Sequence, residues 1–418
     1  MHANKQNLRT HGRMVVLLAC AASLTYSSAF AQSAKVVTFW KAPHHAQEAE
    51  LWQPIIDEFQ KQHPDVKIEH VVTPWATWQE QYSSAFASDS PPCVSYMPDS
   101  YGTSFIFGNK LVDLSDAKYA DQVKDGYGPN WKAANFGGIQ AGIPFAGAPT
   151  MWMYNKDIFD KAKVAYPKDD WTFDDFKNTL KALKDAGVEV PANIPTGGFA
   201  GGGFQGYLPF LWSMGGDLLT KDQKAPAANS PEAVAALKFV KSLFDEGLVA
   251  PVGSYTHLEG EDLFVRGGMA MDNMVAEYLG TLRSQAPDLH YGIVRAPKGP
   301  ALQANFGNWG FFALSKDCKA KDEAFEFMKF ITSKENTEKY LGAVGLYPAR
   351  TDTTLFADKP EEKQFLAGMQ YNKNVPIVPK GQELIDVFFR EIEGALTGQV
   401  TPEEASENAQ QAMQAIIK

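Results

Sequence analysis

Cysteine is scarce in this chain of 418 residues, which contains only three, at positions 20, 93 and 318. Cys20 lies in an N-terminal segment that we expect to be removed, so a framework of several disulfides is excluded. Cys93 and Cys318 could pair in an oxidising compartment, but the sequence does not reveal whether they lie within bonding distance. We therefore expect two buried free thiols, with a single disulfide as the alternative.

Positive charge is also in deficit, because 39 Lys and Arg stand against 49 Asp and Glu, a formal net charge of −10. Nucleic-acid-binding proteins need clustered basic residues, so we expect no nucleic-acid partner. Beyond the N-terminal segment the sequence has no apolar run of the roughly 20 residues that a membrane span needs. A hydrophobic content of 44% is ample for buried cores, and the length predicts about two domains.

Common catalytic motifs are missing from the sequence, which contains no H-E-x-x-H, C-x-x-C or G-x-S-x-G. His44 and His45 are neighbours in the chain, so their rings point in different directions and make a poor metal chelate. Gly201, Gly203 and Gly206 match G-x-G-x-x-G, but prolines flank them in place of a strand–helix unit, which indicates a loop. We therefore expect no catalytic residue, no metal and no cofactor.

The N-terminal segment has the pattern of a secretory signal peptide. Three basic residues and no acid precede the mostly apolar residues 14–22, and Ala-Phe-Ala at 29–31 fits a cleavage site. We expect residues 1–31 to be removed and the mature protein to lie in the periplasm. The alternative is a lipoprotein anchored through Cys20, because the residues before it loosely match a lipidation box.

Strand and helix patterns alternate after this segment. Residues 35–40, 66–72 and 92–97 are short apolar runs typical of buried strands, and 46–62 and 75–87 have helical patterns between them. This order predicts an α/β fold with a mainly parallel sheet.

Residues 142–162 are the stretch around which the rest of the chain is organised. An apolar strand end is followed by the small residues 146–148, a second strand at 151–154 and a helix that starts near Asn155. Gly147 and Pro149 are residues that let a chain bend or fix its path. The pattern predicts two strands separated by a crossover.

This stretch resembles the hinge crossing of family 1 extracellular solute-binding proteins, the maltose-binding-protein-like sugar receptors of bacterial ABC importers. The matching residues are Gly142, Pro144 and Phe145, followed by Tyr-Asn-Lys-Asp-Ile-Phe at 154–159. Further matches in the family's order are Phe39-Trp40, FVRGGMAM at 264–271 and the G-x-x-P-x-R of residues 345–350. Cys93 departs from the family pattern, which usually has an aspartate there.

The resemblance implies a two-lobed periplasmic binding protein fold, type II-like, in which each lobe is a mainly parallel sheet flanked by helices. It implies an N-terminal lobe of residues 32–145 plus 289–332 and a C-terminal lobe of 146–288 plus 333–418, joined by a hinge. A protein of this kind is a receptor and not an enzyme. It closes around a carbohydrate and delivers it to the permease subunits of an ABC transporter, and we expect it to be a monomer.

The resemblance also implies a binding site at the carboxyl ends of the strands, where ligands of α/β folds bind. A sugar needs aromatic faces for its rings and polar side chains for its hydroxyls. The chain has nine Trp, and each of those at element ends, Trp75 among them, can instead be a core residue. Arg350 can instead tie the lobes together. The ligand-binding candidates are Trp40, His44, Trp78, Asp99, Phe145, Gly147, Trp212, Glu277, Tyr278, Asn308, Trp309 and Arg350.

The candidate loops hold carboxylates and few cations, which favours an uncharged sugar, oligosaccharide or polyol. A receptor of the same fold for glycerol phosphate or a polyamine is the alternative. A phosphate would need a basic clamp, whereas carboxylates beside aromatic rings suit an ammonium group. A secreted carbohydrate-active enzyme is a further alternative. It would need two carboxylates about 5–9 Å apart, and Asp99 and Glu277 are the pair to test.

Overall fold

A computed structural model of the protein describes residues 34–88 and 90–417. The expected signal peptide and Cys20 lie outside the described residues. None of the helices in the described part of the chain is both long and apolar enough to cross a membrane. The strands are β1 (Lys35–Lys41), β2 (Val66–Val72), β3 (Val94–Pro98), β4 (Asn135–Phe136), β5 (Ile139–Gln140), β6 (Ile143–Asn155), β7 (Met271–Val275), β8 (Tyr291–Val294), β9 (Asn305–Leu314), β10 (Tyr347–Pro348) and β11 (Asn372–Lys373).

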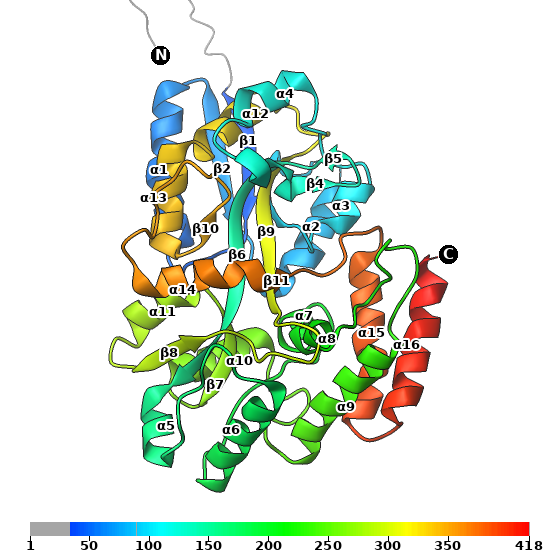
Figure 1. The fold of residues 1–418 in the computed structure, drawn as a ribbon. Coiled ribbons are helices and arrows are strands. Elements are labelled where there is room, and N and C mark those ends of the chain that lie inside the picture. The colour runs from blue at the N-terminus through cyan, green and yellow to red at the C-terminus, as the bar shows by residue number, and fades with distance from the viewer. Residues whose placement is uncertain (1–33, 89, 418) are drawn as a thin grey trace, which may run out of the picture. The chain divides into compact units, whose positions relative to one another are not determined.

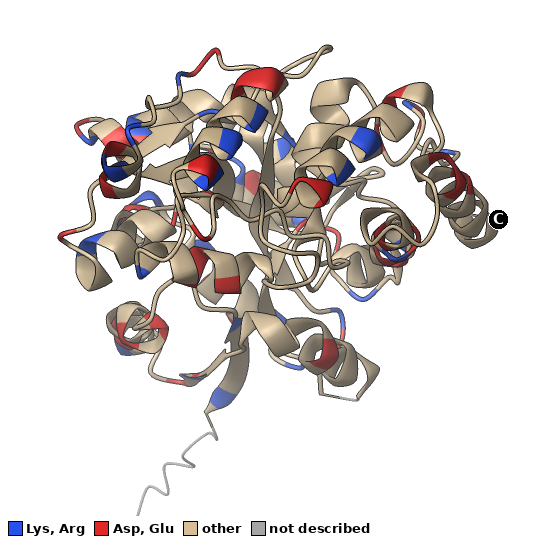
Figure 2. Cartoon of the chain, turned by 90° about the horizontal axis from the view of Figure 1, so that it is seen from below, with Lys and Arg blue, Asp and Glu red and all other residues tan. Residues whose placement is uncertain are grey.

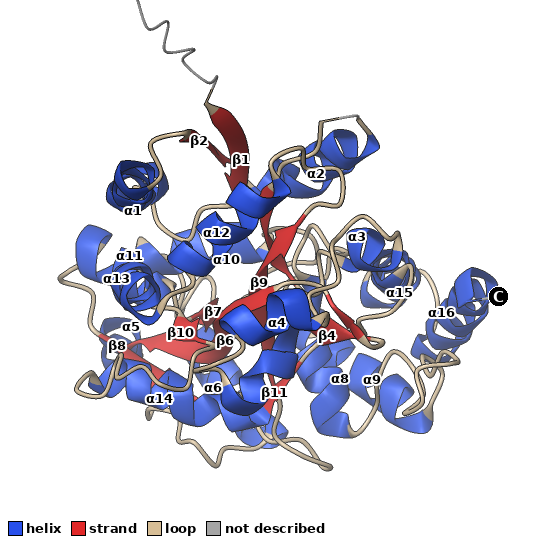
Figure 3. Ribbon diagram, turned by 90° about the horizontal axis from the view of Figure 1, so that it is seen from above, coloured by secondary structure: helices blue, strands red, loops and turns tan. Residues whose placement is uncertain are grey.

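Helices cover the strands on their outer sides (Figures 1 and 3). In the first part of the chain they are α1 (Glu48–Gln62), the 3₁₀ turn η1 (Trp75–Thr77), α2 (Trp78–Ala87), α3 (Thr103–Phe107), α4 (Ala117–Val123) and η2 (Gly128–Ala134). The middle holds α5 (Lys156–Ala162), α6 (Phe173–Asp185), α7 (Gly203–Gly206), α8 (Leu208–Met214), α9 (Pro231–Asp245), α10 (His257–Val265) and α11 (Tyr278–Gln285). The last part holds α12 (Lys321–Ile331), α13 (Lys334–Val344), α14 (Pro360–Gly368), η3 (Met369–Tyr371), α15 (Gly381–Leu396) and α16 (Pro402–Ile417).

The helix starts follow the side-chain chemistry that the sequence supplies. Thr172 and Asp175 form a reciprocal capping box at the start of α6, in which each side chain accepts the other residue's backbone N–H. Thr401 and Glu404 do the same before α16. Charged residues of both signs are spread over the outer helices (Figure 2), which leaves the apolar helix faces free to pack on the sheets.

The main sheet is mixed, with the order β10-β6-β9-β3-β1-β2. Its outer part is parallel as expected, because β1 pairs with β2 and β3 in the same direction. β9 runs antiparallel to both β3 and β6, and its short pair with β11 is parallel. The expectation of a mainly parallel sheet therefore holds for the first three strands, whereas the chain's late return through β9 introduces antiparallel pairs.

β6 is one continuous strand and not two strands with a crossover, so the expected break at residues 146–148 is wrong. Residues 143–149 pair with β9, with a register shift at Pro144, and residues 150–155 pair with β7 and β8. The small residues serve close packing in place of a turn. A Cβ on Gly147 would come within 3.1 Å of the Trp309 ring and 3.2 Å of Met369.

Separate hydrophobic cores lie on the two sides of this shared strand. One includes Phe39 of β1, Trp52 and Phe59 of α1, and Phe312 of β9. The other is built around Trp152 of β6 and the helices α6, α8, α9, α15 and α16. We refer to the parts of the structure around these two cores as the first half and the second half.

Two segments pack differently from the expected lobe boundaries. Helix α13, expected in the C-terminal lobe, places Tyr340, Leu341 and Val344 in the first core. Strand β8, expected in the N-terminal lobe, pairs with the second part of β6. The boundaries stay a prediction, and this packing favours moving both segments to the opposite lobe.

Cys93 and Cys318 form a disulfide with a Cα–Cα distance of 4.8 Å, so the expectation of two free thiols is wrong. Antiparallel pairing of β3 with β9 brings the two residues together, because Cys93 directly precedes β3 and Cys318 follows the end of β9. The bond joins residues 225 positions apart. Sequence spacing alone could not show this pairing.

We expect removal of the disulfide by the double substitution Cys93→Ser and Cys318→Ser to lower the free energy of unfolding by about 2–4 kcal/mol, because the unfolded chain loses a long-range constraint. Urea denaturation measures the change. Wild-type protein treated with a reductant should unfold at the same midpoint as the variant. A reductant that cleaves the bond without moving the midpoint would contradict this expectation.

Candidate functional site

A cavity of about 80 Å³ lies where the two halves meet. Its first wall comes from the loop after β1, η1 and the end of β3, and its second wall from α7, α10 and the end of β7. Aromatic rings from both sides line it: Trp75, Tyr96, Tyr101, Phe204 and Phe306. Its polar lining residues are His44, Gln205, His257, Glu261, Glu277 and Asn308.

A larger depression, which we call the outer hollow, lies beside the cavity and has a volume of about 560 Å³. The two spaces share four lining residues, His44, Trp75, Leu258 and Glu277. These four residues therefore stand between the inner cavity and the outside.

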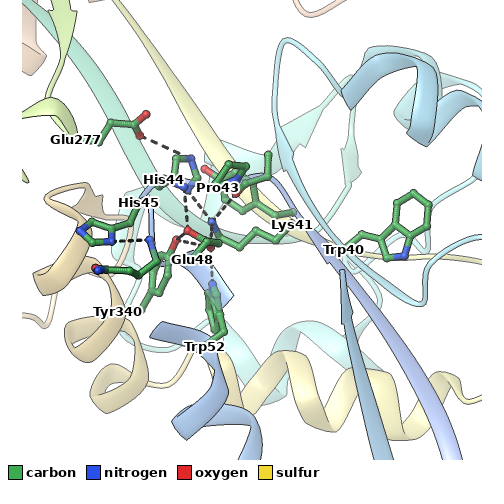
Figure 4. A network of polar contacts seen from close by, with 12 residues as sticks. Trp40, Lys41, Pro43, His44, His45, Glu48, Trp52, Glu277 and Tyr340 are labelled. Atoms are coloured by element: carbon green, nitrogen blue, oxygen red, sulfur yellow. Dashed lines mark hydrogen bonds and ion pairs between the residues drawn. The ribbon is translucent and has the colours of Figure 1, made fainter. Parts of the chain in front are cut away.

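A buried ion pair anchors the first wall of the cavity (Figure 4). Lys41, the last residue of β1, places its Nζ 2.7 Å from Oε1 of Glu48, the first residue of α1, and both side chains are almost fully buried. The Trp52 indole and the Tyr340 hydroxyl also donate to the Glu48 carboxylate, both at 2.8 Å. Breaking such a pair by removing one partner is strongly destabilising, because it leaves an uncompensated buried charge.

The surroundings of this pair act on both pKa values. Burial lowers the pKa of Lys41, and the Glu48 carboxylate acts against that shift. Burial alone would raise the pKa of Glu48, but the Lys41 charge and the hydrogen bonds outweigh it and leave the pKa below its usual value. The lowered pKa keeps Glu48 ionised at neutral pH, and the Lys41 ammonium 2.7 Å away is its counter-charge.

The same lysine orients His44. Lys41 Nζ donates to His44 Nδ1 at 2.7 Å, so the ring proton sits on Nε2, which lies 3.9 Å from a Glu277 carboxylate oxygen. Burial and the Lys41 charge hold the pKa of His44 well below its usual value. His44 is therefore a neutral imidazole with an N–H directed toward Glu277 at the edge of the cavity.

The second wall carries carboxyl groups without a cation beside them. Glu261 Oε1 accepts a hydrogen bond from Gln205 Nε2 at 3.0 Å, and a second, longer one of 3.4 Å from the Val275 N–H. Burial raises the pKa of Glu261 to about 8, although these hydrogen bonds and the nearby Tyr278 hydroxyl act against the rise. Burial, followed by the charge of Glu261, raises the pKa of Glu277 to about 8 as well.

Asp99 holds two strands and a distant loop together. Its carboxylate accepts hydrogen bonds from the N–H groups of Ser100 (2.7 Å) and Trp309 (3.2 Å) and from Asn374 Nδ2 (2.7 Å). Burial raises its pKa to about 6, and these donors act against the shift. The three donors leave this carboxylate little capacity for a ligand.

The structure brings three of the expected site residues to the cavity: His44, Glu277 and Asn308. Tyr278 lines the outer hollow instead. The other candidates lie elsewhere, and their assignment to the ligand stays a prediction that their packing does not favour.

Among those others, Trp78, Phe145 and Trp212 are fully buried core residues, and the Trp212 indole donates to Asp217. The side chain of Trp40 points away from the Lys41 network (Figure 4) and borders a separate surface depression beside α2.

The remaining candidates make structural contacts along the shared strands and within the first half. Gly147 and Trp309 pack on each other where β6 crosses β9. The Arg350 guanidinium pairs with Asp352 and covers the Tyr127 ring. These contacts lie within the first half, so they give Arg350 a structural role there and do not show it tying the lobes together.

Several cavity residues escaped the sequence analysis. Trp75 was weighed but not chosen over Trp78, which faces the core from the next helix. Phe204 and Gln205 lie in the glycine-rich stretch interpreted as a loop, where short α7 presents them to the cavity. Tyr101 follows β3 closely, so the rule for the carboxyl ends of strands could have found it. For Glu261, on the buried face of α10, no sequence signal was available.

The comparisons with known proteins place the chain in a family. A family of bacterial extracellular solute-binding proteins matches residues 42–338. The chain belongs to that family. Among curated relatives, this solute-binding protein is 23% identical to a putative binding protein of Brucella abortus, over 90% of this chain and 92% of the relative. It is also 23% identical to the sn-glycerol-3-phosphate-binding periplasmic protein of Pectobacterium atrosepticum, over 96% and 95%.

Solved structures share the fold. A solute-binding protein of an ABC transporter from Thermotoga lettingae, bound with α-D-tagatose, has a TM-score of 0.82 at 20% identity, with 92% of this chain and 100% of that chain covered. An ABC substrate-binding protein from Listeria monocytogenes in complex with cycloalternan has a TM-score of 0.80 at 23% identity, with 92% and 99% covered. These likenesses confirm the two-lobed periplasmic binding protein fold.

We expect Lys41→Met to lower the free energy of unfolding by about 3–5 kcal/mol, because it leaves the Glu48 carboxylate buried without its counter-charge. Chemical denaturation measures the loss. Lys67→Met is the matched control, since Lys67 pairs with Glu69 on the exposed surface and such pairs contribute less than about 1 kcal/mol. Equal effects of the two substitutions would refute the role of the buried pair.

We expect Glu261→Gln to change how stability depends on pH. The folded chain retains a proton on Glu261 up to a pKa of about 8, whereas the unfolded chain loses it near the ordinary glutamate pKa. This contribution to stability is therefore fully present at low pH and is lost as pH rises toward 8. Relative to wild type, the variant should gain at least about 1 kcal/mol between pH 5 and pH 8. Parallel stability curves from thermal unfolding would contradict this.

Proposed function

We propose that this protein is a periplasmic receptor that captures a carbohydrate between its two lobes and delivers it to the permease of an ABC importer. The observation that carries this proposal is the lining of the cavity. Aromatic rings and hydrogen-bonding side chains from both halves converge there, and no Lys or Arg is among the described residues that line it.

The lining suits a sugar because aromatic rings can cover apolar ring faces while amide, imidazole and carboxyl groups bond hydroxyls. Trp75 is held in place by a hydrogen bond from its indole to the Pro43 carbonyl, and it packs edge-on against Tyr101 at 5.7 Å. Asn308 comes from β9 and Glu277 from the loop after β7, so a ligand between them contacts elements of both halves. The bound sugars of the two structural neighbours support the same ligand class.

A glycerol phosphate ligand is less compatible with the cavity. The relative from Pectobacterium carries that name, but a phosphate is usually held by Arg or Lys side chains or by a helix N-terminus. Lys41, the nearest cation, is already committed to Glu48, His44 and the Ala42 carbonyl. A phosphate would instead meet the carboxyl groups of Glu261 and Glu277.

The proposed mechanism is closure about β6 and β9. Contacts between the halves include the hydrogen bond from Gln382 to Gln79 at 3.0 Å and the edge-on packing of Tyr101 on Phe199 at 4.4 Å. The cavity is small beside the roughly 300–1,000 Å³ typical of ligand sites, so a sugar would enter when these contacts open. A ligand that binds both walls shifts the equilibrium toward the closed form.

The remaining parts of the proposal follow from the family. Export through a cleaved signal peptide, a monomeric state and recognition by the permease subunits are the inferences we attach to it. We propose no catalysis. Of the two carboxylates considered for a glycosidase, Asp99 is occupied by three hydrogen-bond donors and does not line the cavity.

A thermal-shift screen of sugars and polyols tests the proposal. A ligand at a hundred times its dissociation constant should add about 2.7 kcal/mol to the free energy of unfolding. Trp75→Ala should weaken binding of that ligand at least tenfold, because it removes an aromatic wall of the cavity, whereas Trp40→Ala should leave the dissociation constant unchanged. If no carbohydrate stabilises the protein, or if Trp40→Ala has the larger effect, the proposed site is refuted.

A further inference from the structure

The two walls of the cavity differ in charge. In the first wall, Lys41 and Glu48 compensate each other below the surface, and His44 is neutral. In the second wall, Glu261 and Glu277 both line the cavity, and the ion pairs of the described residues include no Lys or Arg partner for either. The cavity is thus lined on one side by acids without a matching base.

Glu261 is built to present one oxygen. Gln205 and the Val275 N–H bind its Oε1, while Oε2 is buried and has no hydrogen-bond partner within the described part of the chain. The residue as a whole is only 1% exposed. A buried polar atom without a partner is costly, so a ligand group that binds it gains the whole of that deficit.

Glu277, in the loop after β7, lines the same space. Its carboxylate lies 3.9 Å from the neutral His44 ring, and no hydrogen bond within residues 34–88 and 90–417 involves its carboxyl group. The rings of Trp75, Tyr101 and Phe204 line the cavity beside these two acids. Aromatic faces next to carboxylates form a favourable environment for an ammonium group.

We propose that the ligand of this cavity is an amino sugar whose protonated amine is held by Glu261 and Glu277. This inference rests on the proposed carbohydrate-receptor function and narrows its substrate class. A neutral sugar could satisfy the same oxygens through hydroxyls, but it would leave both acids in their neutral form. An ammonium group adds an ionic attraction to the carboxylate that forms beside it, and the aromatic rings accept the apolar face of the sugar ring.

Binding of an amino sugar should then release protons from the cavity. The raised pKa values of Glu261 and Glu277, about 8 in the empty protein, keep both acids protonated at pH 6.5. The other titratable groups that act on them are Asp262, Asp272 and Tyr278 beside Glu261, and Glu48 and Lys41 beside Glu277. His44 and His257 also line the cavity, and burial lowers the pKa of both. An ammonium ion beside the acids favours their ionised form, so the carboxyl O–H bond breaks and the proton passes to the buffer. A neutral sugar offers no such driving force.

Isothermal titration calorimetry at pH 6.5 tests this inference, with glucosamine, galactosamine and mannosamine compared with their neutral parent sugars and N-acetyl forms. We expect at least one amino sugar to bind ten times more tightly than both of its neutral forms. Its binding enthalpy should also depend on the ionisation enthalpy of the buffer, because protons are released. A tenfold difference in affinity corresponds to about 1.4 kcal/mol, which is close to what a hydrogen bond to a charged group contributes.

Substitutions test whether Glu261 and Glu277 cause the preference for amino sugars. Glu261→Gln and Glu277→Gln should each remove most of the preference for the amino form over its neutral parent sugar. Cooperative thermal unfolding of each variant shows that it folds. Asp288→Asn is the control, since Asp288 is an exposed acid that does not line the cavity. It should leave the preference unchanged.

The possible results distinguish a failure of the amino-sugar assignment from a failure of the proposed carbohydrate-receptor function. Neutral sugars that bind as tightly as their amino forms, or a preference that survives in both glutamine variants, would overturn the amino-sugar assignment and leave the carbohydrate receptor intact. Binding of a diamine such as putrescine, with no binding of any sugar, would overturn both.

Discussion

The buried contact between Lys41 and Glu48 is the interaction on which the rest of the site depends. It connects the end of the first strand to the start of the first helix and, through Tyr340, to α13, a helix almost 300 residues further along the chain. Because Lys41 also donates to His44 Nδ1, the pair fixes the ring that stands between the cavity and the outer hollow. It also engages the Lys41 ammonium, and no Lys or Arg is among the described residues that line the cavity. The first wall is therefore rigid and neutral, and the electrostatic character of the cavity is set by the second wall alone.

Strands β6 and β9 connect the two halves and keep the backbone of the connection hydrogen-bonded. Two halves that move against each other must still satisfy the backbone hydrogen bonds of the segments that connect them, since buried unpaired groups are costly. Continuous pairing of β6 with β9 does this, and it requires small residues where the strands cross. A Cβ on Gly310 would come within 1.9 Å of the Tyr96 hydroxyl, and one on Gly307 within 2.1 Å of Asn372. The glycines that the sequence places here therefore serve side chains that pack over the sheet, one of which lines the cavity.

The sequence predicted the fold better than the site, for physical reasons. Alternating strand and helix patterns and capping residues are local, so the early α/β units and the start of α6 could be predicted. The motifs that implied the two-lobed fold are likewise short and ordered. What failed depends on contacts between distant segments: the Cys93–Cys318 pairing, the continuity of β6 and the position of α13. At the site, His44 and Glu277 were found because they follow strand ends, and Asn308 was chosen from the family resemblance although it lies within β9. Trp78 and Trp212 were attractive as tryptophans but face the cores. Glu261 could not be found, because a glutamate inside a helix gives no sign that it is buried.

The contrast between the two walls also bears on closure. Burial raises the pKa values of Glu261 and Glu277, and Glu277 also faces His44 of the first wall at 3.9 Å. An empty protein therefore closes most easily with these acids protonated, and closure with ionised acids is opposed. A ligand that forms hydrogen bonds to these carboxyl groups, or neutralises them, removes this free-energy cost of closure. Its preference for the closed form over the open form therefore includes that gain. Charge in the second wall thus acts as a condition on closure: the halves meet readily only when a proton or a ligand satisfies the carboxyl groups between them.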